Sequence, residues 1–101
     1  MPVIVATITP KPDKVDEVAE VLTRVVPEVH DEDGCEVYAL HKGNDRFVFV
    51  EVWRDMAALG AHSAAPSLQA LNEGLEGLVT GPLDVQVLEA LPVGDPVKGS
   101  L

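Results

Sequence analysis

The sequence predicts an α+β domain of the ferredoxin-like type, with the order strand, helix, strand, strand, helix, strand and an antiparallel sheet. Runs of β-branched residues, apolar residues at helical spacing between them, and Gly or Pro at the junctions all indicate this order. A chain of 101 residues has room for one such core. We expect the domain to occupy residues 1–90 and a Pro- and Gly-rich, extended tail to follow at 91–101.

The first strand and the first helix are predicted from the pattern of apolar residues. Residues 3–9 are apolar on both faces of the expected strand, which indicates a fully covered strand. Asp13 is expected to cap the following helix. Pro27 removes one helical hydrogen bond, so we expect a kink or restart there. The helix is amphipathic because apolar residues recur at helical spacing: Val15, Val18, Leu22, Val25, Val26 and Val29.

Two further strands form a predicted hairpin at residues 35–42 and 46–53, joined by the turn signal Gly43-Asn44-Asp45. Both faces of the third strand are mostly apolar, with aromatic residues and Glu51 on one face and valines on the other. Helices can cover only one of these faces. A partner subunit is the economical cover for the other.

The second half of the domain begins with Asp55, which is expected to cap a short helix. Pro66 opens a second helical segment, which carries leucines at helical spacing. Gly81-Pro82 ends it, and residues 83–89 alternate as a half-buried strand.

The net charge of the chain argues against two classes of binding partner. Its 17 acidic and 7 basic residues give a formal net charge of −10. Such a chain should repel nucleic acid and anionic membrane surfaces, so we expect neither as a partner. The start lacks the features of a signal peptide, and no apolar run approaches the roughly 20 residues that cross a bilayer. A single cysteine, Cys35, excludes an intrachain disulfide, and a cytoplasmic location is expected.

Three short motifs follow one another along this topology. They are a Gly-Cys before the second strand, a Glu-x-Trp that ends the third, and an Ala-His four residues before a proline: Gly34-Cys35-x-x-Tyr38, Glu51-x-Trp53 and Ala61-His62-x-x-x-Pro66. In this order and spacing, over roughly residues 3–90, the chain resembles the antibiotic biosynthesis monooxygenase family.

The resemblance implies a homodimer in which two sheets face each other as a dimeric α/β barrel, with a small apolar pocket between each sheet and its helices. It implies a monooxygenase that uses no cofactor and oxidises a quinol or polyketide-like aromatic with O₂. Two alternatives stay open, because the family also contains them: a non-catalytic small-ligand-binding or stress-response protein, and an isomerase of a small metabolite.

His62 and Glu51 are the candidate catalytic residues. The neutral imidazole of His62 could take a phenolic proton at neutral pH, or it could be a structural histidine bonded to a carbonyl or to water. Glu51 is costly to bury without a partner, so it could be a base, could orient His62, or could form a salt bridge with Arg54 or Arg46.

Four residues are candidates for substrate binding. Tyr38 and Trp53 would offer flat walls to an aromatic ligand, although core packing also explains Trp53. Tyr38 shares a face with Glu51 only if the hairpin register is right, and we expect that it does. Phe49 would line the same pocket, and Asn72 would face it from the second helical segment unless its amide is exposed.

Metal and haem chemistry have little support in the sequence. His30, His41 and His62 do not have the spacing of metal ligands. Haem-degrading members of the family carry a haem-ligating histidine at a position that falls near Asn72 in this chain, and no histidine is present there. We therefore expect no metal and no cofactor, and Cys35 is expected to be an inert thiol.

Overall fold

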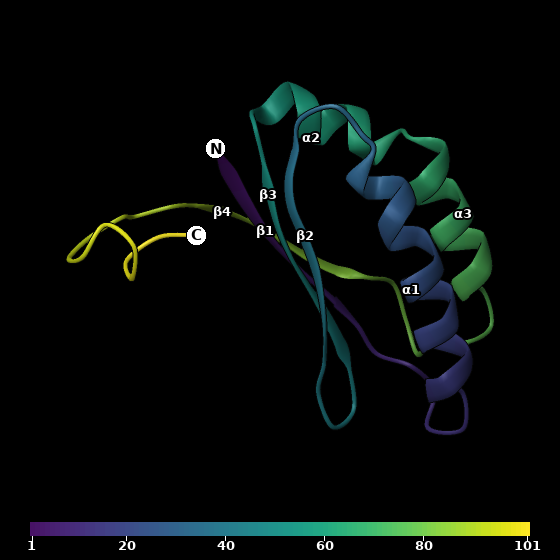
Figure 1. The fold of residues 1–101 in the computed structure, drawn as a ribbon. Coiled ribbons are helices and arrows are strands. Elements are labelled where there is room, and N and C mark those ends of the chain that lie inside the picture. Colours follow the sequence, from purple (N-terminus) through teal and green to yellow (C-terminus); the bar gives the residue numbers. More distant parts are fainter.

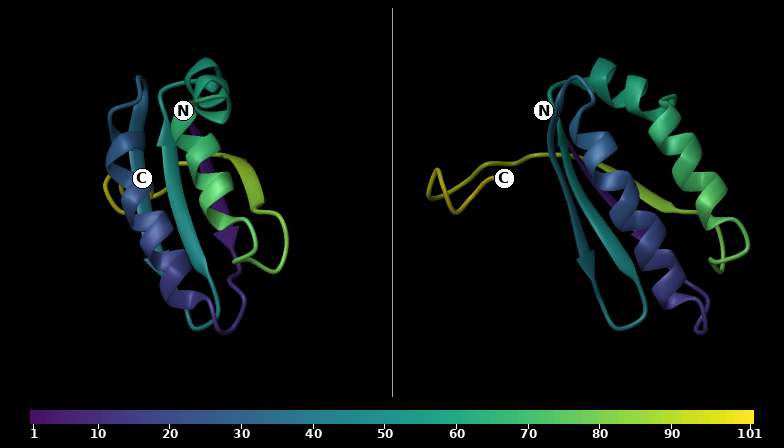
Figure 2. Two further views of the ribbon diagram at one scale, coloured as in Figure 1. Left: turned by 90° about the vertical axis from the view of Figure 1, so that its right-hand side faces the viewer. Right: turned by 45° about the vertical axis from the view of Figure 1, so that its right-hand side comes forward.

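The computed structural model describes residues 1–101 and contains four strands and three helices. The strands form one antiparallel sheet in the order β2-β3-β1-β4, which is the predicted ferredoxin-like topology. In chain order the elements are β1 (Pro2–Ile8), α1 (Val15–His30), β2 (Cys35–Lys42), β3 (Phe47–Trp53), α2 (Met56–Ser63), α3 (Pro66–Leu75) and β4 (Asp84–Glu89). All three helices lie on one side of the sheet, with α1 and α3 next to each other (Figures 1 and 2). No helix combines the length and the apolar composition that a membrane span requires.

The core lies between the sheet and the helix layer. Alternate residues of β1 and β3 point toward the helices, and the apolar stripes of α1 and α3 pack on them. Burial of each large aliphatic side chain contributes about 1.5–3 kcal/mol to folding. The most buried members of this core are Ile4, Ile8, Val18, Leu22, Val29, Phe49, Trp53, Leu71 and Leu75.

The opposite face of the sheet carries valines and is covered by no helix (Figure 2). The register pairs Val3 with Val52, Val5 with Val50, and Val37 with Val52, and paired residues share a face. Most of these side chains are only half-buried. A continuous apolar face of this kind is unusual on a monomeric protein.

Strand β4 is at the edge of the sheet, and all of its residues are exposed. The sequence predicted this strand but also predicted that it would be half-buried. Val85 and Val87 do point to the helix side, since they pair with Ala6 and Ile4. They are nevertheless 53% and 55% exposed, because the helix layer ends at α3 and does not extend over β4.

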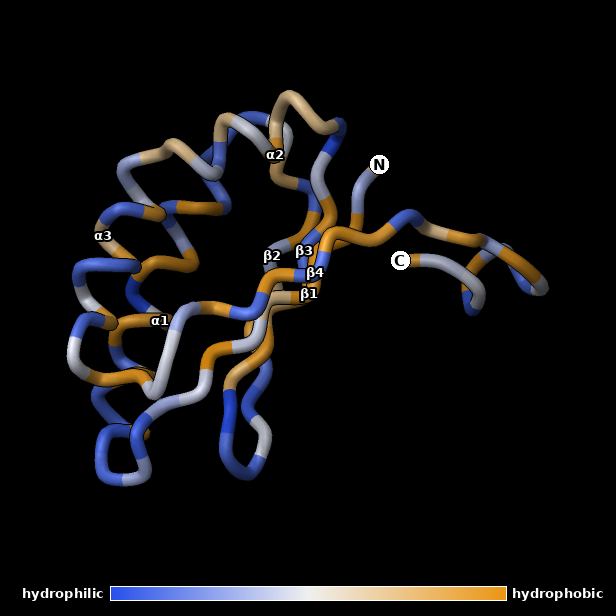
Figure 3. The backbone as a smooth tube through the Cα atoms, turned by 180° about the vertical axis from the view of Figure 1, so that it is seen from behind, coloured by the Kyte–Doolittle hydropathy of each residue, from blue (hydrophilic) through white to orange (hydrophobic).

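The segment after β4 stands clear of the domain (Figure 1). Figure 3 shows that this arm is strongly hydrophobic at several positions. Leu91, Val93, Val97 and Leu101 are each at least 73% exposed. The side chain of Asp95 accepts hydrogen bonds from the backbone N–H groups of Val97 and Lys98, so the arm ends in a defined turn.

Local details of the helices agree with the sequence in some places and differ in others. The Asp55 carboxylate accepts a hydrogen bond from the Ala58 N–H at 2.8 Å, as expected of an N-cap. Asp13 does not cap α1, because the helix starts at Val15 and its N-cap residue is Lys14. The helix also continues through Pro27 without a restart, since the missing hydrogen bond is only one of many and α1 stays packed on both sides of it.

Gly34 offers a test of the packing between the β2 entrance and α2. Its φ is +83°, and a Cβ added there would lie 2.5 Å from the Cβ of Ala58. We expect Gly34→Ala to lower the free energy of unfolding by about 2 kcal/mol or more, from left-handed backbone strain and overpacking. Gly60→Ala in α2 is the matched control, because a Cβ there meets nothing within 4 Å and should raise the stability by up to about 1 kcal/mol. Urea unfolding of both variants checks this, and equal stabilities would contradict it.

Candidate active site

A cavity of about 90 Å³ lies between the sheet and the helix layer. Its walls come from all four strands or their ends and from α2 and α3. Most of the lining is apolar: Ile4, Ala6, Phe49, Leu59, Leu68, Leu71, Leu83 and Val85. The polar part of the lining is Tyr38, Glu51, His62 and Ser63. Since Val85 is half exposed at the sheet edge, the β4 side is the mouth of the cavity.

The hairpin register brings Tyr38 and Glu51 together. Tyr38 on β2 pairs directly with Glu51 on β3, so both side chains point toward the helices. An irregularity between Cys35 and Val37 shifts the register at the start of β2, before this pair. The expectation that these two residues share a face is therefore correct.

Glu51 is a buried carboxylate with one partner. It is 4% exposed, and its Oε1 accepts a hydrogen bond from Nε1 of Trp53 at 2.9 Å. Burial raises the pKa of Glu51, while the hydrogen bond from Trp53 and the nearby His62 partly offset that rise. The salt bridge considered from the sequence is absent, because Arg54 pairs with Asp33 and Asp55, and Arg46 pairs with Asp45.

His62 lies in the last turn of α2 and is 5% exposed. Its ring stacks on Trp53, with centroids 4.5 Å apart and planes inclined by 28°. The rings of Tyr38 and His62 meet edge to face, with their centroids 5.7 Å apart. On the other side, Nδ1 of His62 is 3.0 Å from Oε1 of Glu32, a residue of the loop between α1 and β2. These contacts fix the imidazole between the sheet and the loop.

Three polar atoms of this cluster have no hydrogen-bond partner within the chain: the Tyr38 hydroxyl, Oε2 of Glu51 and Nε2 of His62. Every fully shielded side-chain nitrogen or oxygen has a partner, so these three atoms must border accessible space. The cavity is the space that their residues share. Burial, and next the charge of Glu51, raise the pKa of Tyr38, so its phenol stays protonated and can donate.

The other predicted residues are placed differently. Phe49 lines the cavity and stacks on Tyr38 with a centroid distance of 4.4 Å. Trp53 is fully buried behind Glu51 and His62 and does not line the cavity. Asn72 is exposed on α3 and is not brought to the cavity at all.

The sequence did not indicate Glu32 or Ser67. Glu32 accepts hydrogen bonds from His62 and from Oγ of Ser67, which lies 2.7 Å from Oε2. In the sequence Glu32 stands in the acidic run Asp31-Glu32-Asp33, which is typical of a solvated loop. Its position two residues before the Gly-Cys motif was the only available signal.

Metal ligands do not come together anywhere in the chain, since no three His, Cys, Asp or Glu side chains form a suitable group. Cys35 is half-buried, and burial raises the pKa of its thiol, so it stays protonated.

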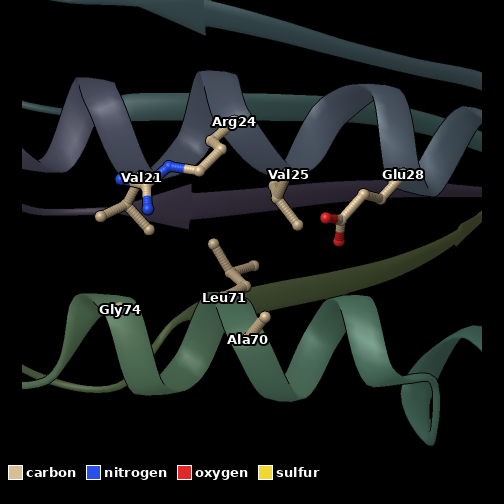
Figure 4. A pocket seen from close by; sticks show the side chains of 7 residues that line it. All are labelled: Val21, Arg24, Val25, Glu28, Ala70, Leu71 and Gly74. Carbon is tan, nitrogen blue, oxygen red and sulfur yellow. The ribbon is translucent and has the colours of Figure 1, made fainter.

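A second hollow lies between α1 and α3, with the sheet behind the helices (Figure 4). It measures about 80 Å³ and includes Arg24 and Glu28 at its rim. The two helices come very close beside it, since a Cβ on Gly74 would be 2.8 Å from Cγ1 of Val21. None of the candidate residues lines this groove, so we assign it no chemistry.

Comparison with known proteins identifies the family. The model of a family described as "Antibiotic biosynthesis monooxygenase" matches residues 1–74. This chain belongs to the antibiotic biosynthesis monooxygenase family. The resemblance expected from the three motifs is thus confirmed.

Solved structures of similar proteins agree with this assignment. Rv0793 from Mycobacterium tuberculosis is 28% identical, with a TM-score of 0.84 over 94% of this chain and 100% of that one. A structure described as an antibiotic biosynthesis monooxygenase is 27% identical, with a TM-score of 0.83 over 91% of this chain and 100% of that one. Among curated proteins, the uncharacterized protein sll1783 of Synechocystis is 30% identical over 85% of this chain. The chain spans 61% of the length of that relative.

The raised pKa of Glu51 predicts how stability varies with pH in this family member. In the folded state Glu51 keeps its proton above the usual value of 4.5, whereas the unfolded chain releases it there. The stability from the protonated group is therefore full below pH 4.5 and is lost as the pH rises through the folded-state pKa. We expect Glu51→Gln, which is always neutral, to gain stability over the wild type as the pH rises from about 4 to 8.

Urea unfolding across this pH range measures the difference. Glu73→Gln on the exposed face of α3 is the matched control, and its difference from the wild type should stay flat. A flat difference for Glu51→Gln would contradict the prediction.

Proposed function

We propose that this chain is a cofactor-independent monooxygenase that oxidises a small, single-ring quinol or phenol with O₂. The observation that supports this most is that Tyr38, Glu51 and His62, each with an unpaired polar atom, line the same mostly apolar cavity. A few placed polar groups in an apolar pocket are typical of sites for small organic ligands. Membership of the antibiotic biosynthesis monooxygenase family supports the reaction class.

The size of the cavity limits the substrate. Drug-sized ligands occupy pockets of about 300–1,000 Å³, and an apolar cavity of about 150 Å³ holds one benzene ring. At about 90 Å³ the cavity excludes the polyketide-like, multi-ring aromatics that the sequence allowed, unless its walls move far. One ring is accommodated by a modest shift of Leu83 and Val85 at the mouth, where the wall is most exposed.

The proposed first step is removal of a phenolic proton. Nε2 of His62 accepts this proton, because it is the unpaired nitrogen of a buried imidazole that borders the cavity. Oε2 of Glu51 accepts a hydrogen bond from the second hydroxyl of a quinol and so orients the ring with its first hydroxyl toward His62. The Tyr38 hydroxyl donates a hydrogen bond to the phenolate oxygen as charge develops on it.

The oxidation then proceeds on the substrate itself. The phenolate gives one electron to O₂, and the resulting phenoxyl radical and superoxide combine through a new carbon–oxygen bond. Protonated His62 returns the proton to this peroxide. Cleavage of the O–O bond, with loss of the ring hydrogen at the same carbon, leaves a new C=O group and water. One oxygen atom of O₂ enters the product, and the two hydrogens of water come from the phenolic O–H and the ring C–H.

A second candidate function is the isomerisation of a small polar metabolite. The volume of the cavity supports it, because a compact hydroxy-carbonyl compound fits without any shift of the wall. His62 and Glu51 would then carry a proton between two carbons, with Tyr38 bonded to the carbonyl oxygen. The same volume would also suit a binding domain without catalysis, but such a domain does not need three unpaired polar atoms.

We also propose that the chain forms a homodimer through the open face of its sheet. The half-buried valines on that face and the apolar arm after β4 leave more apolar surface in water than a stable monomer usually exposes. A second copy of the chain offers the same sheet face, and the dimer would bury both the valine face and the apolar arm.

Oxygen consumption tests the proposed reaction. The metal-stripped protein should consume O₂ with single-ring hydroquinones and not with anthrone-like, three-ring phenols. His62→Ala should lower kcat by about 100-fold or more, because it removes the base. Gln69→Ala is the control, since Gln69 is exposed on α3 and does not line the cavity, so it should leave turnover unchanged. Equal loss in both variants, or no loss in either, would contradict the role of His62, and incorporation of solvent deuterium without O₂ uptake would favour the isomerase.

Light scattering tests the dimer. The wild type should have twice the mass of the chain at micromolar concentration, and Val50→Lys should reduce it to the mass of the chain by placing a charge in the centre of the open face. Gln69→Lys adds the same charge on the exposed surface of α3 and should leave the dimer intact. A monomeric wild type would rule out this assembly.

A further inference from the structure

A carboxylate outside the cavity holds the imidazole that we propose as the base. Glu32 accepts from Nδ1 of His62 at 3.0 Å to Oε1 and 3.2 Å to Oε2. It also accepts from Oγ of Ser67 at 2.7 Å to Oε2. The three residues lie on the α1–β2 loop, α2 and α3, so the contact forms only when the whole helix layer is assembled.

Glu32 has no other strong partner. Its side chain is 17% exposed, and the nearby arginine, Arg54, is engaged by Asp33 and Asp55 instead. A carboxylate in so little water needs the hydrogen bonds that it accepts. Its interactions with His62 and Ser67 are therefore the ones that keep it in place.

The chemistry of these contacts fixes the tautomer of His62. An ionised carboxylate only accepts hydrogen bonds, so Nδ1 must carry the hydrogen in the neutral imidazole. Nε2 then has a lone pair and no partner within the chain, and it belongs to a residue that lines the cavity. Stacking on Trp53 keeps the ring plane fixed while Glu32 fixes its rotation.

We infer that Glu32 is a positioning residue, held by Ser67, that keeps His62 in the Nδ1–H tautomer with Nε2 directed to the cavity as the proton acceptor. Without Glu32 the neutral ring can carry its hydrogen on Nε2, where it cannot accept the substrate proton. This inference rests on the proposed function for its catalytic consequence, but the tautomer itself does not depend on it.

A second histidine provides an internal reference. Nε2 of His30 is 3.0 Å from the backbone oxygen of Tyr38, and a carbonyl oxygen only accepts. His30 must therefore be the Nε2–H tautomer when it is neutral. The two histidines should show opposite patterns of protonated and unprotonated ring nitrogens.

Nitrogen-15 NMR of the histidine rings, at a pH where both are neutral, tests the inference. In the wild type, His62 should be protonated on Nδ1 and His30 on Nε2. Glu32→Ala should move His62 toward the Nε2–H tautomer and leave His30 unchanged, while Ser67→Ala keeps the Glu32 carboxylate and should change His62 far less. If Glu32→Ala does not fold, Glu32→Leu, which fills more of the space and also lacks an acceptor, serves in its place, and the wild-type spectrum is decisive by itself. Protonation of wild-type His62 on Nε2, or an Nδ1–H His62 that persists without Glu32, would overturn the inference.

Kinetics separate this inference from the proposed function. With the substrate found in the oxygen assay, Glu32→Ala should lower kcat by about 10- to 100-fold with little change in KM. A lower affinity with an unchanged kcat would overturn the positioning role. A wild type that shows the expected tautomer but consumes no O₂ would overturn the oxygenase and leave the assignment of Glu32 supported.

Discussion

Strand β3 lies inside the sheet, and the alternation of its side chains decides what meets the helices. Phe49, Glu51 and Trp53 all point to the helix layer, while the valines between them point away. A carboxylate in that row is expensive, because it loses most of its contact with water. The hydrogen bond from Trp53, two residues along the same strand, compensates only one of its oxygens. The other oxygen, Oε2, has no hydrogen-bond partner within the chain.

The burial of Glu51 also distinguishes the side chain that supports the site from the side chains that line the cavity. Trp53 is fully enclosed, supports Glu51 through its indole N–H and supports His62 by stacking. It thus belongs to the frame of the site and not to its surface. Tyr38, Glu51 and His62 keep one unpaired atom each at the cavity, and an apolar surrounding strengthens every interaction made there. In the proposed reaction, this arrangement would supply orientation and proton transfer, and the electrons would pass directly from the substrate to O₂.

Most of the fold could be predicted from the sequence because its elements are marked locally. Runs of β-branched and apolar residues identified the strands, helical spacing identified α1, and Gly43-Asn44-Asp45 identified the hairpin. The exposure of β4 could not be predicted in this way, because it depends on how far the helix layer reaches across the sheet. Glu32 was missed for a similar reason: it lies 30 residues from His62 along the chain, and only the packing of three elements brings them together. Asn72 differs in another way. The sequence placed it correctly on α3, but the rotation of that helix turns its side chain to the solvent and away from the cavity.

The close approach of α1 and α3 limits where a small molecule could reach the cavity. At Gly74 the two helices leave no room for even a methyl group against Val21, so they pack tightly at this point. The more exposed boundary is the opposite one, where β4 and the Gly81-Pro82 connection have no helix on top of them. A small molecule that reaches the cavity would therefore enter beside β4, at the free edge of the sheet.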